Sequence, residues 1–410
     1  MNTRVGGTAG RASRWTWLPV VFVPLVAWSK DAAVPALVLV AVLTVAQRGR
    51  APTERMLYPL SPAVMIFGAA FVFWTVISMT WAPAPDWSNW LKAFGAMIAA
   101  VIAVCGLARV SEAVLEKTVP PLTIATIVLF VLLLVERITG GALIGSVRVH
   151  DPAARLFDLM SPGLMLLCAL AYPVAFLLWR RAGKWILSAG FVLAIFAMAL
   201  TYRMDAAPFA LAAGAVSWLL VRLLGRAGFI FVVAGLCVVT LSWGPAATLA
   251  WSHGLVDWFD NIATTNWGYR IEIWHRVSQL IAERIWLGYG FDAARYLGKP
   301  GVSPIVFLHP HNGLLQVWLE LGAVGAALFL GWALSCAAAL LQSSARTPVL
   351  AIVAATVTAL AVFWSISFGI WQGWWISAIG LTLCALAVVI RLGSDHSSRS
   401  MSADSASSIR

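Results

Sequence analysis

Residues 312–341 read NGLLQVWLELGAVGAALFLGWALSCAAALL, and this stretch decides the class of fold. It is long enough to cross the roughly 30 Å hydrocarbon core of a bilayer as a helix, and most of its side chains are apolar. Asn312, Gln316 and Glu320 recur every fourth residue, which places them on one face of that helix. A polar stripe on a spanning helix should face protein or a water-filled cavity. We therefore expect a membrane helix packed inside a bundle.

The whole chain has the composition of a polytopic membrane protein. Of its 410 residues, 61% are hydrophobic and 11% are charged, whereas soluble proteins are about half apolar. The 22 tryptophans suit the membrane–water interface. The net charge of +11 fits basic residues that gather on the cytoplasmic side, and so predicts membrane lipids rather than nucleic acid as partners. The five cysteines lie in apolar runs without metal-ligand spacing and are interpreted as small buried hydrophobic residues.

Apolar runs between polar or Pro/Gly breaks predict an all-α bundle of about twelve transmembrane helices. We expect them at 15–29, 33–46, 60–80, 90–108, 118–136, 160–179, 185–202, 205–224, 227–250, 312–341, 347–368 and 371–391. The first two runs are short, so one of them could form a re-entrant hairpin. The expected organisation is helices 1–9 in residues 1–250, an outer loop domain at 251–311, helices 10–12 in 312–391, and a disordered tail at 392–410.

The basic residues place both termini in the cytoplasm. The termini and the even-numbered junctions between spans hold most of the 28 lysines and arginines, as cytoplasmic segments do. We expect no cleavable signal peptide, because the first apolar run has no small-residue cleavage site before the second. The outer loops at 137–159 and 251–311 also carry arginines, but long loops escape the charge rule and are usually functional or disordered.

The larger outer loop contains an amphipathic helix. From Arg270 to Trp286, apolar residues recur at helical spacing, and charged or amide side chains fill much of the other face. Gly288 and Gly290 then end the helix. It could lie on the outer membrane surface with its arginines at lipid phosphates, or cover a cavity in the bundle as a lid. The two interpretations are compatible.

The stretch LHPHN, residues 308–312, brings two imidazoles to the start of the tenth span. Pro310 disfavours helical backbone at His309. Proline also suits the first turn of a helix, so we expect the helix to start near His311 or Asn312. Both residues should then lie at the outer membrane interface, at the top of the polar stripe.

This segment resembles the bacterial O-antigen ligase superfamily. Residues 311–325, HNGLLQVWLELGAVG, match the pattern H-[NSQ]-x9-G-x2-G that marks the superfamily. The upstream loop helix and the GYG stretch at 288–290 add to the resemblance. It is detailed from about Arg203 to Gly325 and covers the rest of the chain only as topology. Gly322 and Gly325 are interpreted as packing glycines that let helices approach closely.

The resemblance implies a glycosyltransferase C-type fold with a large periplasmic loop, in the bacterial inner membrane. Such enzymes transfer a glycan from undecaprenyl pyrophosphate, and in the ligases the acceptor is the lipid A–core oligosaccharide of lipopolysaccharide. They are metal-independent inverting transferases, so no cofactor is expected. By resemblance the catalytic residues are His311 in the motif, Arg203 near the outer end of an earlier helix, and Arg270 at the start of the loop helix.

The chemistry of this transfer suits these residue types. Arginine presents a planar fork of donors to phosphate and stays charged, so it can stabilise a departing pyrophosphate. A sugar hydroxyl is a poor nucleophile, and a positioned histidine base gives roughly 10²–10⁴-fold acceleration. Arg203 could instead form a structural ion pair with the nearby Asp205.

Further candidates for substrate binding are Asn312, His309, Arg148, Arg155, Glu320 and Trp374. The two arginines could bind phosphate or acidic core sugars, or pair with neighbouring aspartates. Glu320 is more simply an interior hydrogen-bond acceptor. Trp374 belongs to a group of tryptophans that flank the last outer turn, which could stack on sugars, grip the prenyl chain or form an ordinary interfacial belt.

A metal site is the less favoured interpretation. Zinc ligands do occur at the spacing of His309 and His311, but a third ligand is needed, and Asp292 is the nearest candidate. Asp86 lacks a second acid nearby and is interpreted as an interface loop residue. The last outer loop, FGIWQGWW at 368–375, departs from the family because it carries no carboxylate where some members have one.

Four functions stay open on the sequence. The compact loops and the form of the motif favour a ligase over two relatives, an O-antigen polymerase that joins repeat units on lipid carriers and a protein O-oligosaccharyltransferase. A membrane transporter is the alternative from a different class. Against it, the helices show no internal repeat and the polar residues gather at one face, whereas transporter sites lie near mid-membrane.

Overall fold

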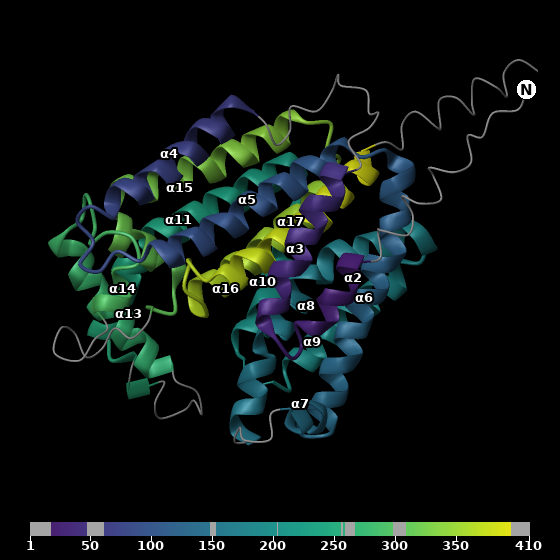
Figure 1. Cartoon of the computed structure of the whole chain (residues 1–410), viewed down its shortest axis with the longest axis horizontal. Helices are drawn as coiled ribbons and strands as arrows, with labels where there is room; N and C mark the ends of the chain where they lie inside the picture. Colours follow the sequence, from purple (N-terminus) through teal and green to yellow (C-terminus); the bar gives the residue numbers. More distant parts are fainter. Residues whose placement is uncertain are drawn as a thin grey trace, which may run out of the picture.

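The computed structural model describes residues 18–46, 61–147, 153–202, 204–255, 257–258, 267–297 and 309–394. The regular structure within these ranges is helical, without a strand (Figure 1). The expected all-α class of a polytopic membrane protein is therefore confirmed.

A helix occupies each of the twelve expected spans. They are α2 (Leu18–Leu25), α3 (Ala33–Ala46), α4 (Pro62–Ser78), α5 (Trp87–Arg109), α6 (Glu112–Ile138), α8 (Ala153–Ala182), α9 (Trp185–Ala199), α10 (Ala206–Leu224), α11 (Arg226–Ser252), α15 (Gly313–Gln342), α16 (Thr347–Ile366) and α17 (Gly373–Ser394). Among the described residues, eight of these are long and apolar enough to cross a membrane. The other four, α2, α3, α4 and α9, are shorter.

The bundle is built around α8, α16 and α17, whose apolar segments are mostly enclosed by protein. Neighbouring pairs are α10 with α16, α5 with α17, and α15 with α4 (Figure 1). Peripheral helices such as α11 bury only 22% of their apolar window and expose large side chains such as Phe231 and Val238. In a bilayer, lipid tails would cover these side chains, so their exposure fits a membrane protein.

The outer loop has two described helices, α13 (Trp267–Glu283) and α14 (Ala294–Leu297), which lie at one end of α15 (Figure 1, green). The amphipathic helix therefore begins and ends three residues earlier than the expected 270–286. Its apolar face, which includes Ile273 and Val277, is buried, and it packs against α11 and α15. The helix thus lies on the bundle, as a lid would. Large apolar side chains are exposed at Tyr269 and at the following Ile285–Leu287.

A break in α15 holds this loop. Gly322 has φ 65° and ψ −167°, which interrupts the helix, and the freed backbone groups bond to residues 285–290. These bonds are Tyr289 N to Leu319 O (2.9 Å), Gly290 N to Glu320 O (2.8 Å), Ala323 N to Ile285 O (2.7 Å) and Val324 N to Trp286 O (3.3 Å). Backbone polar groups inside a membrane need such partners.

The interpretation of Gly322 as a glycine that brings helices together is wrong. A Cβ on Gly322 would lie 2.3 Å from the carbonyl oxygen of Trp286, and one on Gly288 would lie 2.5 Å from Glu320 O. Both residues have positive φ, where side chains other than glycine are strained. These glycines therefore let loop backbone enter the broken helix.

Candidate active site

The turn before α15 differs from the expected helix start. His311 has φ 51°, in the left-handed region, and Asn312 is extended with φ −149°. The Asn312 side chain accepts a hydrogen bond from Leu315 N at 2.9 Å, so it is the N-cap and the helix begins at Gly313. The prediction that Pro310 forms the first helical turn is wrong, because a capping asparagine and a left-handed residue follow it.

The two imidazoles form one unit. The His311 backbone N–H donates to His309 Nδ1 at 3.1 Å, and the ring centroids are 4.4 Å apart. His311 Nδ1 lies 3.1 Å from the carbonyl oxygen of Ser367. A carbonyl can only accept, so Nδ1 carries the proton. In neutral His311 the lone pair is therefore on Nε2, the nitrogen that can act as a base.

Both histidines are held neutral near pH 7. Burial, together with the neighbouring His311 and Arg295, lowers the pKa of His309 to about 3. Burial also lowers the pKa of His311, the Ser367 hydrogen bond opposes this, and nearby Arg270 adds to it. A neutral imidazole is the form that accepts a proton from a hydroxyl.

Arg270 stands on the first turns of α13. Its guanidinium carbon lies 5.4 Å from the centre of the Trp267 ring, and burial lowers its pKa while Asp205 raises it. One turn further along, Trp274 Nε1 donates to Pro310 O at 3.0 Å. This bond fixes α13 against the histidine turn and explains why Arg270 influences His311.

Asp205, just before α10, joins that helix to α13. Its carboxylate accepts a hydrogen bond from Trp267 Nε1 at 2.9 Å. Arg203, two residues earlier, lies outside the described residues, so both its catalytic role and its pairing with Asp205 stay predictions. Arg148 also lies outside them, and Arg155 is in α8 with a side chain that is not described.

The polar stripe on α15 faces the protein interior, as expected. Asn312, Gln316 and Glu320 are all buried. The Glu320 carboxylate accepts four hydrogen bonds, from Asp292 N (2.9 Å), Ala294 N (3.2 Å), Gln316 Nε2 (2.9 Å) and Trp371 Nε1. Gln316 Oε1 accepts from Ile370 N at 3.0 Å. Glu320 is thus an interior acceptor that ties α15 to two outer loops, while its role in substrate binding stays a prediction.

Trp374, at the start of α17, is only 6% exposed. Its Nε1 donates to Gln372 Oε1 at 2.9 Å, and Lys30 Nζ lies 5.7 Å from its ring centre. Phe368 packs edge-on against the ring at 5.0 Å. Sugar stacking on Trp374 is therefore a prediction that requires Lys30 to move.

The described residues contain no group of three or more His, Cys, Asp or Glu that could hold a metal ion. Asp292, the candidate third ligand, accepts hydrogen bonds from Asn89 Nδ2 (2.9 Å) and Arg295 Nε (3.0 Å) instead. Asp86 caps α5 by accepting from Asn89 N at 2.9 Å. The acids near the histidines therefore have structural partners.

Sequence reasoning missed the contacts that three residues make at this site. Ser367 acts through its carbonyl, Asp205 through Trp267, and Arg295 through its charge near His309. A carbonyl contact leaves no trace in residue type. Asp205 had a signal, because it lies at the start of the helix predicted at 205–224, whereas Arg295 lies beside no predicted helix end.

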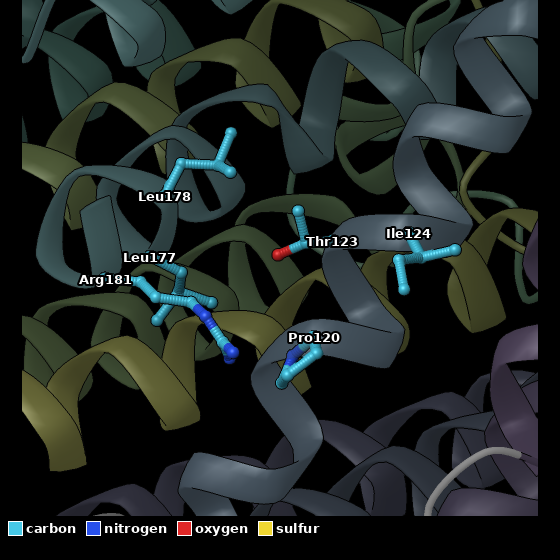
Figure 2. A pocket seen from close by; sticks show the side chains of 6 residues that line it. All are labelled: Pro120, Thr123, Ile124, Leu177, Leu178 and Arg181. Carbon is cyan, nitrogen blue, oxygen red and sulfur yellow. The ribbon is translucent and has the colours of Figure 1, made fainter. Parts of the chain in front are cut away.

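A pocket of about 260 Å³ lies elsewhere, between α6 and α8. Figure 2 shows its six lining side chains, with Arg181 reaching toward Pro120. It contains none of the candidate site residues. Arg181 is in the last turn of α8, at the end of the bundle away from the histidine turn.

The fold and site define a polytopic helical membrane protein with a histidine–arginine centre at one end of the bundle. Residues 189–330 match the family model described as O-antigen ligase, a stretch that contains α13, the histidine turn and the break in α15. Over this region the chain is similar to the O-antigen ligase family.

Proteins provisionally named as polysaccharide ligases are similar to parts of the chain. One from Rickettsia conorii is 35% identical over 120 residues, which is 27% of this chain and 29% of that protein. One from Rickettsia typhi is 30% identical over 176 residues, 40% of this chain and 42% of that protein. One from Rickettsia bellii is 29% identical over 132 residues, 30% and 32% respectively. The matches span less than half of these relatives.

Proposed function

We propose that the chain is an O-antigen ligase of the bacterial inner membrane. It transfers a polysaccharide from undecaprenyl pyrophosphate to the lipid A–core oligosaccharide on the periplasmic side, which completes lipopolysaccharide. The observation that carries the proposal is the hydrogen bond from His311 Nδ1 to the Ser367 carbonyl at 3.1 Å. It leaves Nε2 as a base beside an arginine, within a region of the O-antigen ligase family.

In the proposed reaction, His311 Nε2 takes the proton of an acceptor hydroxyl. The hydroxyl oxygen forms a bond to the anomeric carbon of the donor sugar as the bond from that carbon to the pyrophosphate oxygen breaks. The electron pair leaves with the lipid pyrophosphate, whose growing charge Arg270 and Arg203 stabilise. The imidazolium then returns its proton to water, and the anomeric configuration is inverted.

The distribution of arginines supports the proposed orientation. The site lies at the start of α10, α15 and α17 and at the end of α16. The last turns of α5, α8, α10 and α17, which lie at the opposite end, contain Arg109, Arg180, Arg181, Arg222 and Arg391. Basic residues favour the cytoplasmic side. The site end is then periplasmic, with both termini in the cytoplasm, and the large outer loop is periplasmic.

A deletion strain tests the function in cells. We expect lipopolysaccharide with core only, together with accumulated lipid-linked polymer, and restoration by the wild-type gene. Complementation with His253→Ala, which changes an exposed histidine at the end of α11, should also restore the polymer. Core that carries a single repeat unit would contradict a ligase and indicate a polymerase. Unchanged lipopolysaccharide with altered glycosylation of proteins would indicate a protein O-oligosaccharyltransferase.

A further inference from the structure

Arg295, on α14, is a second fixed cation beside the histidine pair. Its Nε donates to Asp292 Oδ1 at 3.0 Å, and its side chain is 46% exposed. The terminal nitrogens of the guanidinium have no hydrogen-bond partner among the described residues. The terminal N–H groups of the half-exposed Arg295 guanidinium are therefore available as hydrogen-bond donors at the outer face of the site.

Asp292 holds this guanidinium in one direction. The aspartate side chain is 3% exposed and also accepts from Asn89 Nδ2 at 2.9 Å. Its backbone N–H is bonded to Glu320 at 2.9 Å, and its φ of 60° is one that a non-glycine residue adopts only when its surroundings enforce it. Surface ion pairs are usually loose, but here α5, α15 and the outer loop together fix the acidic partner.

Arg295 and Arg270 are brought to the histidine turn by separate contacts. Ala294, next to Arg295, donates its N–H to Glu320 Oε1 at 3.2 Å, and Gln316 Nε2 donates to the same oxygen at 2.9 Å. Trp274, in the same helix as Arg270, donates to Pro310 O at 3.0 Å. Among the charges that act on each ring, Arg295 affects His309 and Arg270 affects His311. The two arginines come from different helices, α14 and α13. Two cations from separate helices therefore lie near the histidine pair.

The chemistry of inversion separates the tasks of these cations. In the proposed function the attacking hydroxyl and the leaving pyrophosphate lie on opposite faces of the anomeric carbon. The proposed function assigns Arg270 to the leaving group, which leaves Arg295 as the cation for the acceptor. A planar guanidinium matches the two oxygens of a phosphate or carboxylate.

We propose that Arg295 is a specificity-determining residue that binds an anionic group, a phosphate or carboxylate, on the acceptor glycan. This inference rests on the proposed function for the identity of the acceptor. Asp292 is a positioning residue that orients the Arg295 fork without contact to the substrate.

Binding of the acceptor without donor tests the proposal directly. Purified full-length protein in detergent is titrated with phosphorylated lipid A–core and with the same material after phosphatase treatment. For wild type we expect phosphate removal to weaken binding about 10-fold, as for a lost charge-assisted hydrogen bond. Arg295→Gln should bind both forms equally weakly, and Arg295→Lys should recover only part of the difference. Arg284→Gln, at an exposed arginine over the Tyr289 ring in the same loop, should behave as wild type.

Steady-state transfer supplies the second readout. Arg295→Gln should raise the acceptor KM about 10-fold, and leave the donor KM and kcat within about twofold. A raised donor KM would overturn the proposal and assign Arg295 to the pyrophosphate. Equal discrimination between the two acceptor forms by wild type and Arg295→Gln would overturn it as well, and a lowered melting temperature would then assign the residue a structural ion pair.

The two proposals fail separately. If wild type transfers no polysaccharide but discriminates the two acceptor forms through Arg295, the proposed function fails and acceptor binding stands. If wild type transfers polysaccharide and Arg295→Gln matches it in both assays, the ligase stands and this inference fails.

Discussion

The hydrogen bond between His311 and the Ser367 carbonyl settles which imidazole nitrogen can do chemistry. His309 has the opposite arrangement, because its Nδ1 accepts from the His311 backbone and its Nε2 carries the proton when the ring is neutral. In the proposed function, the two neighbouring histidines therefore differ in role. One presents a basic nitrogen, and the other shapes the turn that holds it.

Replacing each histidine should separate these roles. We expect His311→Ala to lower the transfer rate by roughly 10²–10⁴-fold, the usual contribution of a general base, with normal amounts of protein in the membrane. His309→Ala should do less harm, because the ring acts through turn geometry. Transfer rates of purified variants at equal amounts measure this. Near-normal transfer by His311→Ala would reject His311 as the base.

The pH dependence of transfer should report the surroundings of His311. Burial and Arg270 lower its pKa from the ordinary 6.5, so the neutral base persists below pH 6.5 and activity should fall only on further acidification. Arg270→Gln removes a cation that disfavours the imidazolium, so the pKa of His311 should rise. The acid limb of the remaining activity should therefore move to a higher pH. The measurement is kcat/KM against pH for both proteins. An acid limb that does not move, or moves to lower pH, would contradict the assigned proximity.

Substituting lysine for the arginines should expose their geometry. Arg270→Lys and Arg203→Lys keep the charge but lose the bidentate fork, so we expect losses of roughly 10- to 150-fold in rate at saturating donor. Arg270→Lys should also raise the donor KM, because α13 belongs to the outer loop. Arg284→Lys is the matched control. Wild-type rates in both variants would mean that these arginines are structural or lipid-surface residues.

At the scale of elements, the broken helix α15 and residues 285–290 form one interlocked unit. The break supplies two carbonyls and two amides to the loop, and Trp74 Nε1 also donates to Leu321 O at 3.0 Å. The same helix starts at Asn312, so the loop, the break and the histidine turn share one rigid support. This explains how a loop outside the bundle can hold Arg270 near His311.

Gly322→Ala should loosen that unit. The new Cβ would lie 2.3 Å from Trp286 O at a φ of 65°, and a non-glycine residue in such backbone costs about 1–3 kcal/mol. We expect a lower melting temperature in detergent and reduced transfer. Gly190→Ala is the control, since a Cβ there meets nothing within 4 Å. Equal melting temperatures of the two variants would show that the backbone of Gly322 does not require glycine.

Over the whole molecule, the sequence predicted helix positions well because the bilayer leaves few alternatives: an apolar run such as 347–368 must form a helix to satisfy its backbone. The polar stripe from Asn312 was predictable for the same reason. Non-local contacts were not predictable. Trp267, at the start of α13, bonds to Asp205 from a distant part of the sequence. The left-handed backbone of His311 and the orientation of the Arg295 guanidinium also do not depend on sequence neighbours alone.

The site and the basic helix ends occupy opposite ends of the bundle, and in the proposed function this arrangement would bring both substrates to one surface. A lipid-linked donor stays in the membrane, and the acceptor is also a lipid, so transfer needs a centre at the depth of their head groups. The histidine turn lies at the boundary between α15 and the outer loop, which suits that requirement of the proposed function.

Reconstituted transfer tests the central claim most directly. The purified chain is placed in liposomes with undecaprenyl-pyrophosphate-linked O-antigen and lipid A–core, and the products are separated by size and probed for both glycans. The account predicts a product in which the polysaccharide is attached to lipid A–core, formed by wild type and His253→Ala and absent with His311→Ala. Elongation of the lipid-linked donor without attachment to lipid A–core, or equal product with His311→Ala, would contradict it.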